Sequence, residues 1–453
     1  MAQGFLFYNK KANSKSEDLK WWQLSLIGVG CTIGTGYFLG SSLGIKETGP
    51  SIVFTFILAA IGTYIVFNQL AKMTAKDPQE GSFCYYANKA FGPWAGFSCG
   101  WNYWFSNILI MGSQLTALSL LSQFWFPKIP LWVFACIYAV LSLFVVFLGT
   151  KGFDRVENYL AIIKTAAIIM FIGLAAAAVF GWIHGGNGDV SIPRSMDDIF
   201  PKGYKGFWIS LLFAFYAYGG IEVIGLMAMQ LKDKKDAPKA GTNMLIILVI
   251  IYVLSLGLAT ILAPLDQFSE KESPFVTALS DYHLNFFPHV FNGAIIIAGF
   301  STMTAALFGV TSLLVTMAKG GDAPKIFTKK LKKFNQLPLP SFILGGVGLF
   351  ASVIAALLLP GKIFEYITTA AGILLLYNWT FILLSSFKVL QGNLWDKLKA
   401  SFGILLIAIA VAGTIIEKAV RIGFFVSLAF VLIIAAATFF MRHKLGKNKP
   451  SCS

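Results

Sequence analysis

Long apolar stretches alternate with short polar segments along most of this 453-residue chain. A helix of about 20 apolar residues crosses a bilayer core about 30 Å thick, and twelve stretches reach that length. The pattern therefore predicts an all-α integral membrane protein with twelve transmembrane helices. The predicted spans are 22–45, 50–74, 94–125, 130–150, 155–182, 207–231, 240–264, 286–318, 338–359, 361–388, 396–418 and 420–441.

Composition and charge agree with a membrane protein. Hydrophobic residues make up 57% of the chain and charged residues 13%, whereas a soluble domain holds about 25% charged residues. The net charge of +15 does not indicate nucleic acid binding, because the basic residues lie in short loops between apolar stretches. Of the 36 Lys and Arg residues, 25 fall in the two tails and in the loops after even-numbered helices. This bias predicts a multi-pass membrane protein with both termini in the cytoplasm.

The titratable and nucleophilic side chains do not predict an enzyme. The five cysteines are scattered, without the spacing of a zinc site or a disulfide framework. The four histidines fall in or beside predicted loops, and we find no nucleophile–base pair or phosphate-binding loop in the sequence. We therefore expect no metal and no organic cofactor, and a small molecule and the lipid bilayer as partners.

The first apolar stretch carries glycine and threonine at its centre, in Thr32-Ile33-Gly34-Thr35-Gly36. Glycine costs about 1 kcal/mol per residue in a helix relative to alanine, so this segment is expected to interrupt the helix. The freed N–H groups of the second half-helix would then meet a carboxylate at the positive end of its dipole. The alternative is close helix packing, because Gly30 and Gly34 have the spacing of a small-xxx-small motif.

The sixth stretch contains a comparable interruption in FAFYAYGGIEVIG. Its glycine pair would free carbonyls for an ammonium group, and Tyr216 can close over a small solute, although aromatic packing is the simpler interpretation. Glu222 argues against packing alone, because an ionisable group inside a span is costly and is usually functional. Interruptions at matching positions of two inverted halves predict the binding site of a transporter.

Two lysines also fall inside predicted spans. Lys164 lies nine residues after Arg155, which places it about 13 Å into the fifth helix. It is either functional or extends its stem toward the cytoplasmic surface. Lys72 lies near the cytoplasmic end of the second helix, where such an extension is the favoured interpretation.

Four segments resemble the amino acid permeases of the amino acid–polyamine–organocation superfamily, and within it the bacterial amino acid transporter branch. They are IGVGCTIGTGYFLGSS, DPQEGSFCYYANKAFGPWAGFSCGWNYW, FAFYAYGGIEVIG and SPFV. The resemblance implies a LeuT-like five-plus-five inverted repeat with broken helices 1 and 6, and proton-driven uptake. The implied organisation is a cytoplasmic tail, two repeats, two further helices and a second cytoplasmic tail, at 1–20, 21–182, 207–390, 396–441 and 442–453.

The resemblance also implies roles for individual residues. It places the substrate carboxylate at the break in helix 1 and the ammonium group against backbone carbonyls. The implied substrate-binding residues are Thr32, Ile33, Gly34, Thr35, Gly36, Tyr216 and Gly219. Tyr216 matches a gating aromatic, Glu222 the acid of helix 6, and Lys164 a lysine implicated in proton coupling.

The chain departs from the pattern of this branch at three places. Lys72 and Gln114 stand where acids are usual in helices 2 and 3, and the arginine usual late in helix 8 is missing. The loss of an acid from a pocket favours neutral over cationic substrates. We therefore predict an importer of neutral amino acids that is coupled to protons.

Two rival functions share this fold. An amino acid exchanger would bind the same substrates without coupled uptake, but exchangers of the superfamily often lack a lysine at the position of Lys164. A sodium symporter would need hard oxygen ligands, which Ser301 and Thr302 of helix 8 could supply.

Overall fold

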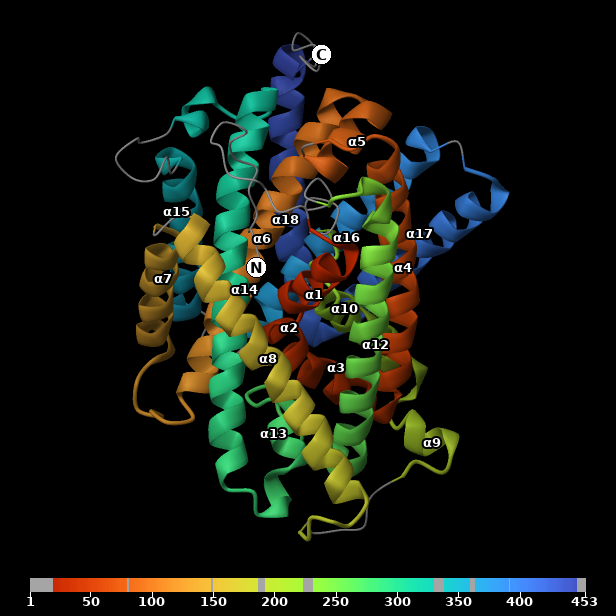
Figure 1. Ribbon diagram of the computed structural model, residues 1–453, viewed down its shortest axis with the longest axis vertical. Coiled ribbons are helices and arrows are strands. Elements are labelled where there is room, and N and C mark those ends of the chain that lie inside the picture. Colours follow the sequence, from red (N-terminus) through yellow and green to blue (C-terminus); the bar gives the residue numbers. More distant parts are fainter. Residues whose placement is uncertain are drawn as a thin grey trace.

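The computed structural model is almost entirely helical in the part of the chain that it describes. It describes residues 19–79, 81–147, 150–185, 192–222, 231–329, 338–358, 363–390 and 392–445. Most of the longer helices run roughly along the long axis of the molecule (Figure 1). The helices are α1 (Trp21–Thr32), α2 (Thr35–Phe38), α3 (Gly40–Thr48), α4 (Ile52–Lys76), α5 (Ser82–Phe91), α6 (Pro93–Ser122), α7 (Leu131–Phe147), α8 (Thr150–Val179), α9 (Met196–Ile199), α10 (Gly203–Ala217), α12 (Ala237–Leu262), α13 (Pro274–Ala278), α14 (Phe286–Gly320), α15 (Leu339–Leu358), α16 (Ile363–Val389), α17 (Leu394–Ile416) and α18 (Lys418–Leu445).

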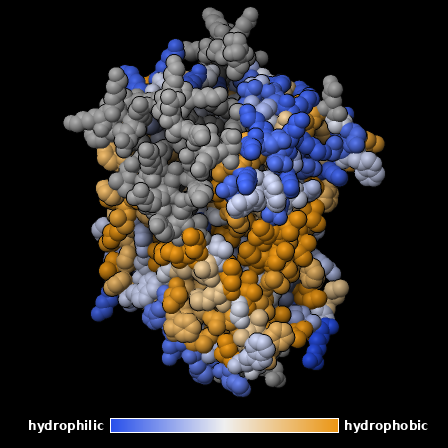
Figure 2. Space-filling model, in the orientation of Figure 1, coloured by the Kyte–Doolittle hydropathy of each residue, from blue (hydrophilic) through white to orange (hydrophobic). Residues whose placement is uncertain are grey.

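Eight helical segments of the described chain are long and apolar enough to cross a membrane. They are Thr35–Lys76, Pro93–Ser122, Ile162–Val179, Lys234–Leu262, Phe286–Gly320, Phe364–Val389, Leu394–Ile416 and Val420–Met441, and shorter apolar helices cover Leu131–Phe147 and Leu339–Ile354. Hydrophobic side chains form a band across the described part of the face in Figure 2, and hydrophilic ones gather toward its ends. The chain is thus a multi-pass membrane protein, whereas the twelve-helix inverted repeat stays a prediction.

Helix α6 lies at the centre of the bundle and α18 at its edge. In the most apolar part of α6, 78% of the residues are buried inside the protein, whereas in that of α18 only 11% are. The buried face of α6 carries polar groups, among them Asn102, Ser113 and Gln114, and packs against α14 and α16. The outer surface of α18 is apolar instead, because it faces the hydrocarbon of the bilayer.

The predicted break in the first apolar stretch is confirmed. Helix α1 ends at Thr32, Ile33 and Gly34 have extended backbone, and α2 begins at Thr35. In the sixth stretch α10 ends at Ala217 and a turn follows. Residues 223–230 of that predicted span lie outside the described residues.

Short helices occupy segments that the sequence pattern assigned to loops. Helix α5 lies at one end of the bundle, whereas α9 and α13 lie at the other end (Figure 1). Helix α5 packs against α6 and α16, and its Tyr86 donates a hydrogen bond to the carbonyl of Asp77 at 2.8 Å. A helix of ten residues is too short to cross a bilayer, so the length of apolar stretches does not predict α5.

Candidate substrate site

A cavity lies against both helix breaks, between α1–α2, α6, α10, α14 and α16. It contains about 1,070 Å³ of empty space, counting the part that is continuous with solvent. The residues of the two breaks that line it are Cys31, Thr32, Gly34, Gly36, Gly219 and Gly220. One face of α6 supplies the opposite wall through Tyr103, Asn107, Ile110 and Gln114, which follow one another at helical spacing.

The glycines of the first break allow close approach of neighbouring side chains. A Cβ atom at Gly36 would lie 2.8 Å from Cε1 of Tyr216, and one at Gly34 would lie 3.1 Å from Thr302. In the described part of the chain, the structure gives no hydrogen bond to the N–H groups of Thr35 and Gly36, whereas those of Tyr37 and the next two residues are bonded within the turn. Both N–H groups are therefore unbonded at the start of α2 within the described chain, and Gly36 lines the cavity.

The remaining predicted residues of this segment are placed differently. Thr32 lines the cavity, and its hydroxyl donates to the carbonyl of Gly28 at 2.9 Å. Ile33 and the side chain of Thr35 are fully buried and are not among the lining residues described. Their contribution to binding can come only from their backbone groups.

Tyr216 covers the break on one side of the cavity. Its ring packs over Gly36, and its hydroxyl lies near Ser113 of α6. Ser113 in turn lies 2.6 Å from the hydroxyl of Thr368 on α16. The ring over Gly36 is what fits the predicted role of a gate.

The turn after α10 needs glycine at one position. Gly220 has a φ of +108°, a backbone conformation that residues other than glycine rarely adopt. A Cβ atom there would also lie 3.3 Å from Oγ1 of Thr32. The carbonyl of Tyr216 already accepts the N–H of Gly219 at 3.0 Å, so it has one lone pair left for an ammonium group.

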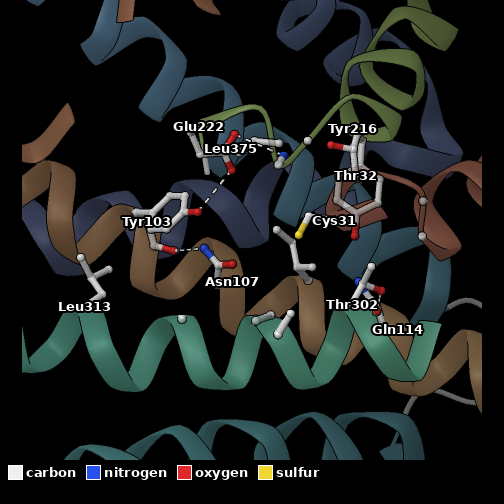
Figure 3. A pocket seen from close by; sticks show the side chains of 18 of the residues that line it. Cys31, Thr32, Tyr103, Asn107, Gln114, Tyr216, Glu222, Thr302, Leu313 and Leu375 are labelled. Atoms are coloured by element: carbon white, nitrogen blue, oxygen red, sulfur yellow. Dashed lines mark hydrogen bonds between the residues drawn. The ribbon is translucent and has the colours of Figure 1, made fainter. Parts of the chain in front are cut away.

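Glu222 is buried at the end of the cavity away from Gln114 (Figure 3). Its Oε1 accepts the hydroxyl of Tyr103 at 3.3 Å, and its Oε2 accepts the N–H of Gly220 at 3.2 Å. Nε1 of Trp379 on α16 donates to Oε2 at 3.4 Å. The carboxylate is therefore surrounded by donors from the protein, and it ties the turn after α10 to α6 and α16.

Lys164 lies apart from the cavity lining. It is fully buried on α8, and its Nζ donates to Oγ of Ser301 on α14 at 3.1 Å. Full burial excludes a snorkelling role, because the ammonium group does not reach solvent or headgroups. The next residue of α14, Thr302, faces the cavity instead.

Two of the three departures from the branch pattern have clear partners. The hydroxyl of Thr302 hydrogen-bonds to Oε1 of Gln114 and also lies 3.1 Å from the carbonyls of Ala298 and Gly299 in its own helix. Lys72 forms an ion pair with Asp396 of α17 at 2.8 Å, and both side chains are partly exposed. Lys72 therefore belongs to a helix-to-helix contact outside the cavity.

Several lining residues had not been singled out from the sequence. Tyr103, Asn107 and Ile110 could have been found, because they share one face of an apolar helix with Gln114. Leu375, which lines the cavity, and Trp379, which donates to Glu222, carry no such signal, since they come from a distant helix whose packing only the fold establishes.

The cavity extends from the breaks toward the end of the molecule that carries α5. Along α14 its lining runs from Thr302 to Thr316, about 21 Å at 1.5 Å per residue. Gly81, which directly precedes α5, lines the same end. The cavity therefore reaches from the breaks toward the α5 end, and Tyr216 covers the break on the other side.

Comparison with known proteins matches nearly the whole chain. The profile of the family described as Amino acid permease covers residues 23–443. The uncharacterized transporter YcgH of Bacillus subtilis (strain 168) is 53% identical over 97% of this chain and 99% of its own length. Aromatic amino acid transport proteins AroP of Corynebacterium glutamicum and Escherichia coli O6:H1 are 31% and 29% identical, each over 82% of this chain and 81% of the relative. The profile match includes both helix breaks and all helices that line the cavity.

Proposed function

Because this chain belongs to the amino acid permease family, we propose that it imports neutral amino acids across the plasma membrane by proton-coupled alternating access. The observation that carries the proposal is the cavity at two helix breaks, where glycines bring backbone groups to the surface. Exposed N–H and carbonyl groups recognise the carboxylate and ammonium ends that all amino acids share. The remaining wall then selects the side chain.

In this proposal the substrate carboxylate binds the N–H groups of Thr35 and Gly36. The ammonium group faces the carbonyls of Thr32, Tyr216 and Gly219, and Ile33 and Gly34 form the extended link between the half-helices. The ring of Tyr216 closes the side of the site that lies away from α5. The free N–H groups at the start of α2 support this arrangement.

The lining supports a neutral substrate side chain. The described lining residues include no Lys, Arg or His, and their one acid is Glu222, which already accepts three hydrogen bonds. Ala305, Ala306 and Gly309 form a low wall on α14, and a Cβ atom at Gly309 would meet nothing within 4 Å. The free space beside Gly309 fits a large substrate side chain. Because the AroP relatives are named aromatic amino acid transport proteins, aromatic amino acids are the first substrates to test.

Lys164 is the proposed proton-coupling residue. A fully buried ammonium group bonded to Ser301 can link two helices when protonated and release them when neutral. The bond occupies one of the two hydroxyls that a sodium site would need, and Gln114 occupies the other. These contacts favour proton over sodium coupling.

We further propose twelve helices in a five-plus-five inverted repeat, with both termini in the cytoplasm. Helix α14 ends at Gly320, next to the most basic predicted loop, and the cavity lining runs along α14 toward that end. On this orientation the cavity lies on the cytoplasmic side of the breaks. Reporter fusions at the C-terminus and between α8 and α9 should report opposite sides of the membrane.

The test is uptake into proteoliposomes under an imposed pH gradient, with and without sodium. A panel of twenty amino acids competes against a labelled aromatic one. Accumulation that follows the pH gradient and is inhibited by neutral amino acids supports the proposal. Uptake that requires an internal amino acid would establish the exchanger, and a strict need for sodium would establish the symporter.

A further inference from the structure

We propose that Gln114 donates a hydrogen bond to the carboxylate of the bound amino acid, and that Thr302 orients its amide for this contact. The inference rests on the proposed function. It adds a side-chain donor to a carboxylate site that otherwise consists of backbone N–H groups.

The amide of Gln114 is buried but borders the cavity. Gln114 is 5% exposed, and it lines the cavity from α6 opposite Thr302 of α14. Figure 3 shows the two side chains together at one end of the cavity, away from Glu222. Within the described part of the chain, the side-chain amide of Gln114 makes one hydrogen bond, in which its Oε1 accepts the hydroxyl of Thr302. Since Oε1 is occupied, the NH₂ group is the part left to bind a ligand.

Thr302 places this amide beside the first helix break. Its Oγ1 lies 3.1 Å from the position that a Cβ atom of Gly34 would take. The same hydroxyl bonds to Gln114, so one side chain separates the amide from the extended backbone before α2. A carboxylate at the N–H groups of Thr35 and Gly36 would therefore come within reach of Nε2.

The chemistry of the cavity makes a neutral donor useful at this place. The described lining has no cationic side chain, so a substrate carboxylate must be stabilised by N–H and O–H donors alone. Hydrogen bonds to a charged acceptor are about twice as strong as those between neutral groups. A buried NH₂ group without an acceptor is unfavourable, and the substrate carboxylate would remove that cost.

The alternative is that Gln114 only connects α6 to α14. The two roles are separated by measuring two ligands, the best competitor in the amino acid panel and its primary carboxamide, on the purified full-length protein. A residue that contacts the carboxylate changes the ratio of the two dissociation constants, whereas a purely structural residue changes both constants alike.

For Gln114→Met we expect the Kd of the amino acid to rise about 10- to 100-fold, and that of the carboxamide less than threefold. Gln114→Glu should lose more at pH 8, because two carboxylates would then face each other. It should recover partly at pH 5, since a protonated glutamate can donate. Thr302→Val should show the same selective loss to a smaller degree, and it serves if substitutions at Gln114 do not fold.

Asn107→Leu is the matched control. This amide lines the same cavity, but its Nδ2 already donates to the carbonyl of Tyr103 at 2.9 Å, so both ligands should change alike. Equal weakening of both ligands by Gln114→Met and by Thr302→Val would overturn the inference and leave the proposed function intact. A wild-type protein that binds no amino acid would overturn both.

Discussion

Replacement of Gly36 by alanine tests the site with one added carbon atom. The new Cβ would lie 2.8 Å from Cε1 of Tyr216, whereas ordinary contact begins at 3.4 Å. The ring must therefore retreat by about 0.6 Å, and overpacking of this kind costs about 1–3 kcal/mol. The cost falls on the conformation in which the ring covers the break, so a substrate that needs this cover loses affinity by up to the same amount. At 1.4 kcal/mol for each factor of ten, the Kd should rise about 5- to 150-fold.

Two further glycines make this prediction graded. Gly34→Ala brings its Cβ to 3.1 Å from Thr302, which must give way by a smaller distance, so its effect should be weaker. Gly40→Ala is the control, because the nearest atom, the carbonyl oxygen of Thr35, lies 3.9 Å away. The assay is equilibrium binding on purified protein, with thermal stability measured in parallel. If Gly36→Ala bound the substrate with wild-type affinity, Tyr216 would not cover the bound substrate, and the glycine would serve helix packing alone.

Three other predictions follow from single contacts. Lys164→Met and Lys164→Arg should both abolish accumulation driven by a pH gradient in proteoliposomes, the latter because guanidinium does not deprotonate; wild-type accumulation in either would remove Lys164 from coupling. Tyr216→Phe keeps the ring that packs over Gly36, so its KM should change little, whereas Tyr216→Ala removes this cover and should raise KM; a severe defect in the Phe variant would instead make the hydroxyl a ligand. Burial raises the pKa of Asp322, in the loop after α14, to about 6, against about 3.9 in an unfolded chain. The folded state therefore binds this proton more tightly, and stability should fall by at most about 3 kcal/mol as pH rises from about 4 to about 6. Asp322→Asn should flatten that part of the pH profile of thermal unfolding, and an unchanged slope would contradict the assignment.

Hydrophobic patterning predicted the helices because the bilayer requires the same of each one. A span must be apolar over about 20 residues whatever it packs against, so stretches such as 286–318 mark α14 closely. The break at Gly34 was also predictable, since glycines and threonines are unfavourable at the centre of a span. Helix α5 was not predicted because it has only ten residues and does not cross the bilayer, so it need not be apolar throughout.

The wall of the cavity could not be predicted in the same way. Thr302 was noted as a possible sodium ligand, yet its partner is Gln114, which lies 188 residues earlier on another helix. The polar residues of α6 mark one of its faces, but sequence alone does not say which helix that face meets. Leu375 and Trp379 enter the site only through the packing of α16.

Adjacent residues of α14 connect the two parts of the proposed mechanism. Ser301 holds the ammonium group of Lys164, and Thr302 contacts Gln114 and the backbone at Gly34. Successive residues of a helix point about 100° apart, so a single peptide unit faces the coupling residue on one side and the substrate site on the other. A rotation or shift of this turn when Lys164 loses its proton would move Thr302 as well. In the proposed mechanism a single peptide bond, between Ser301 and Thr302, therefore connects the proton-binding residue to the substrate site when both contacts are formed.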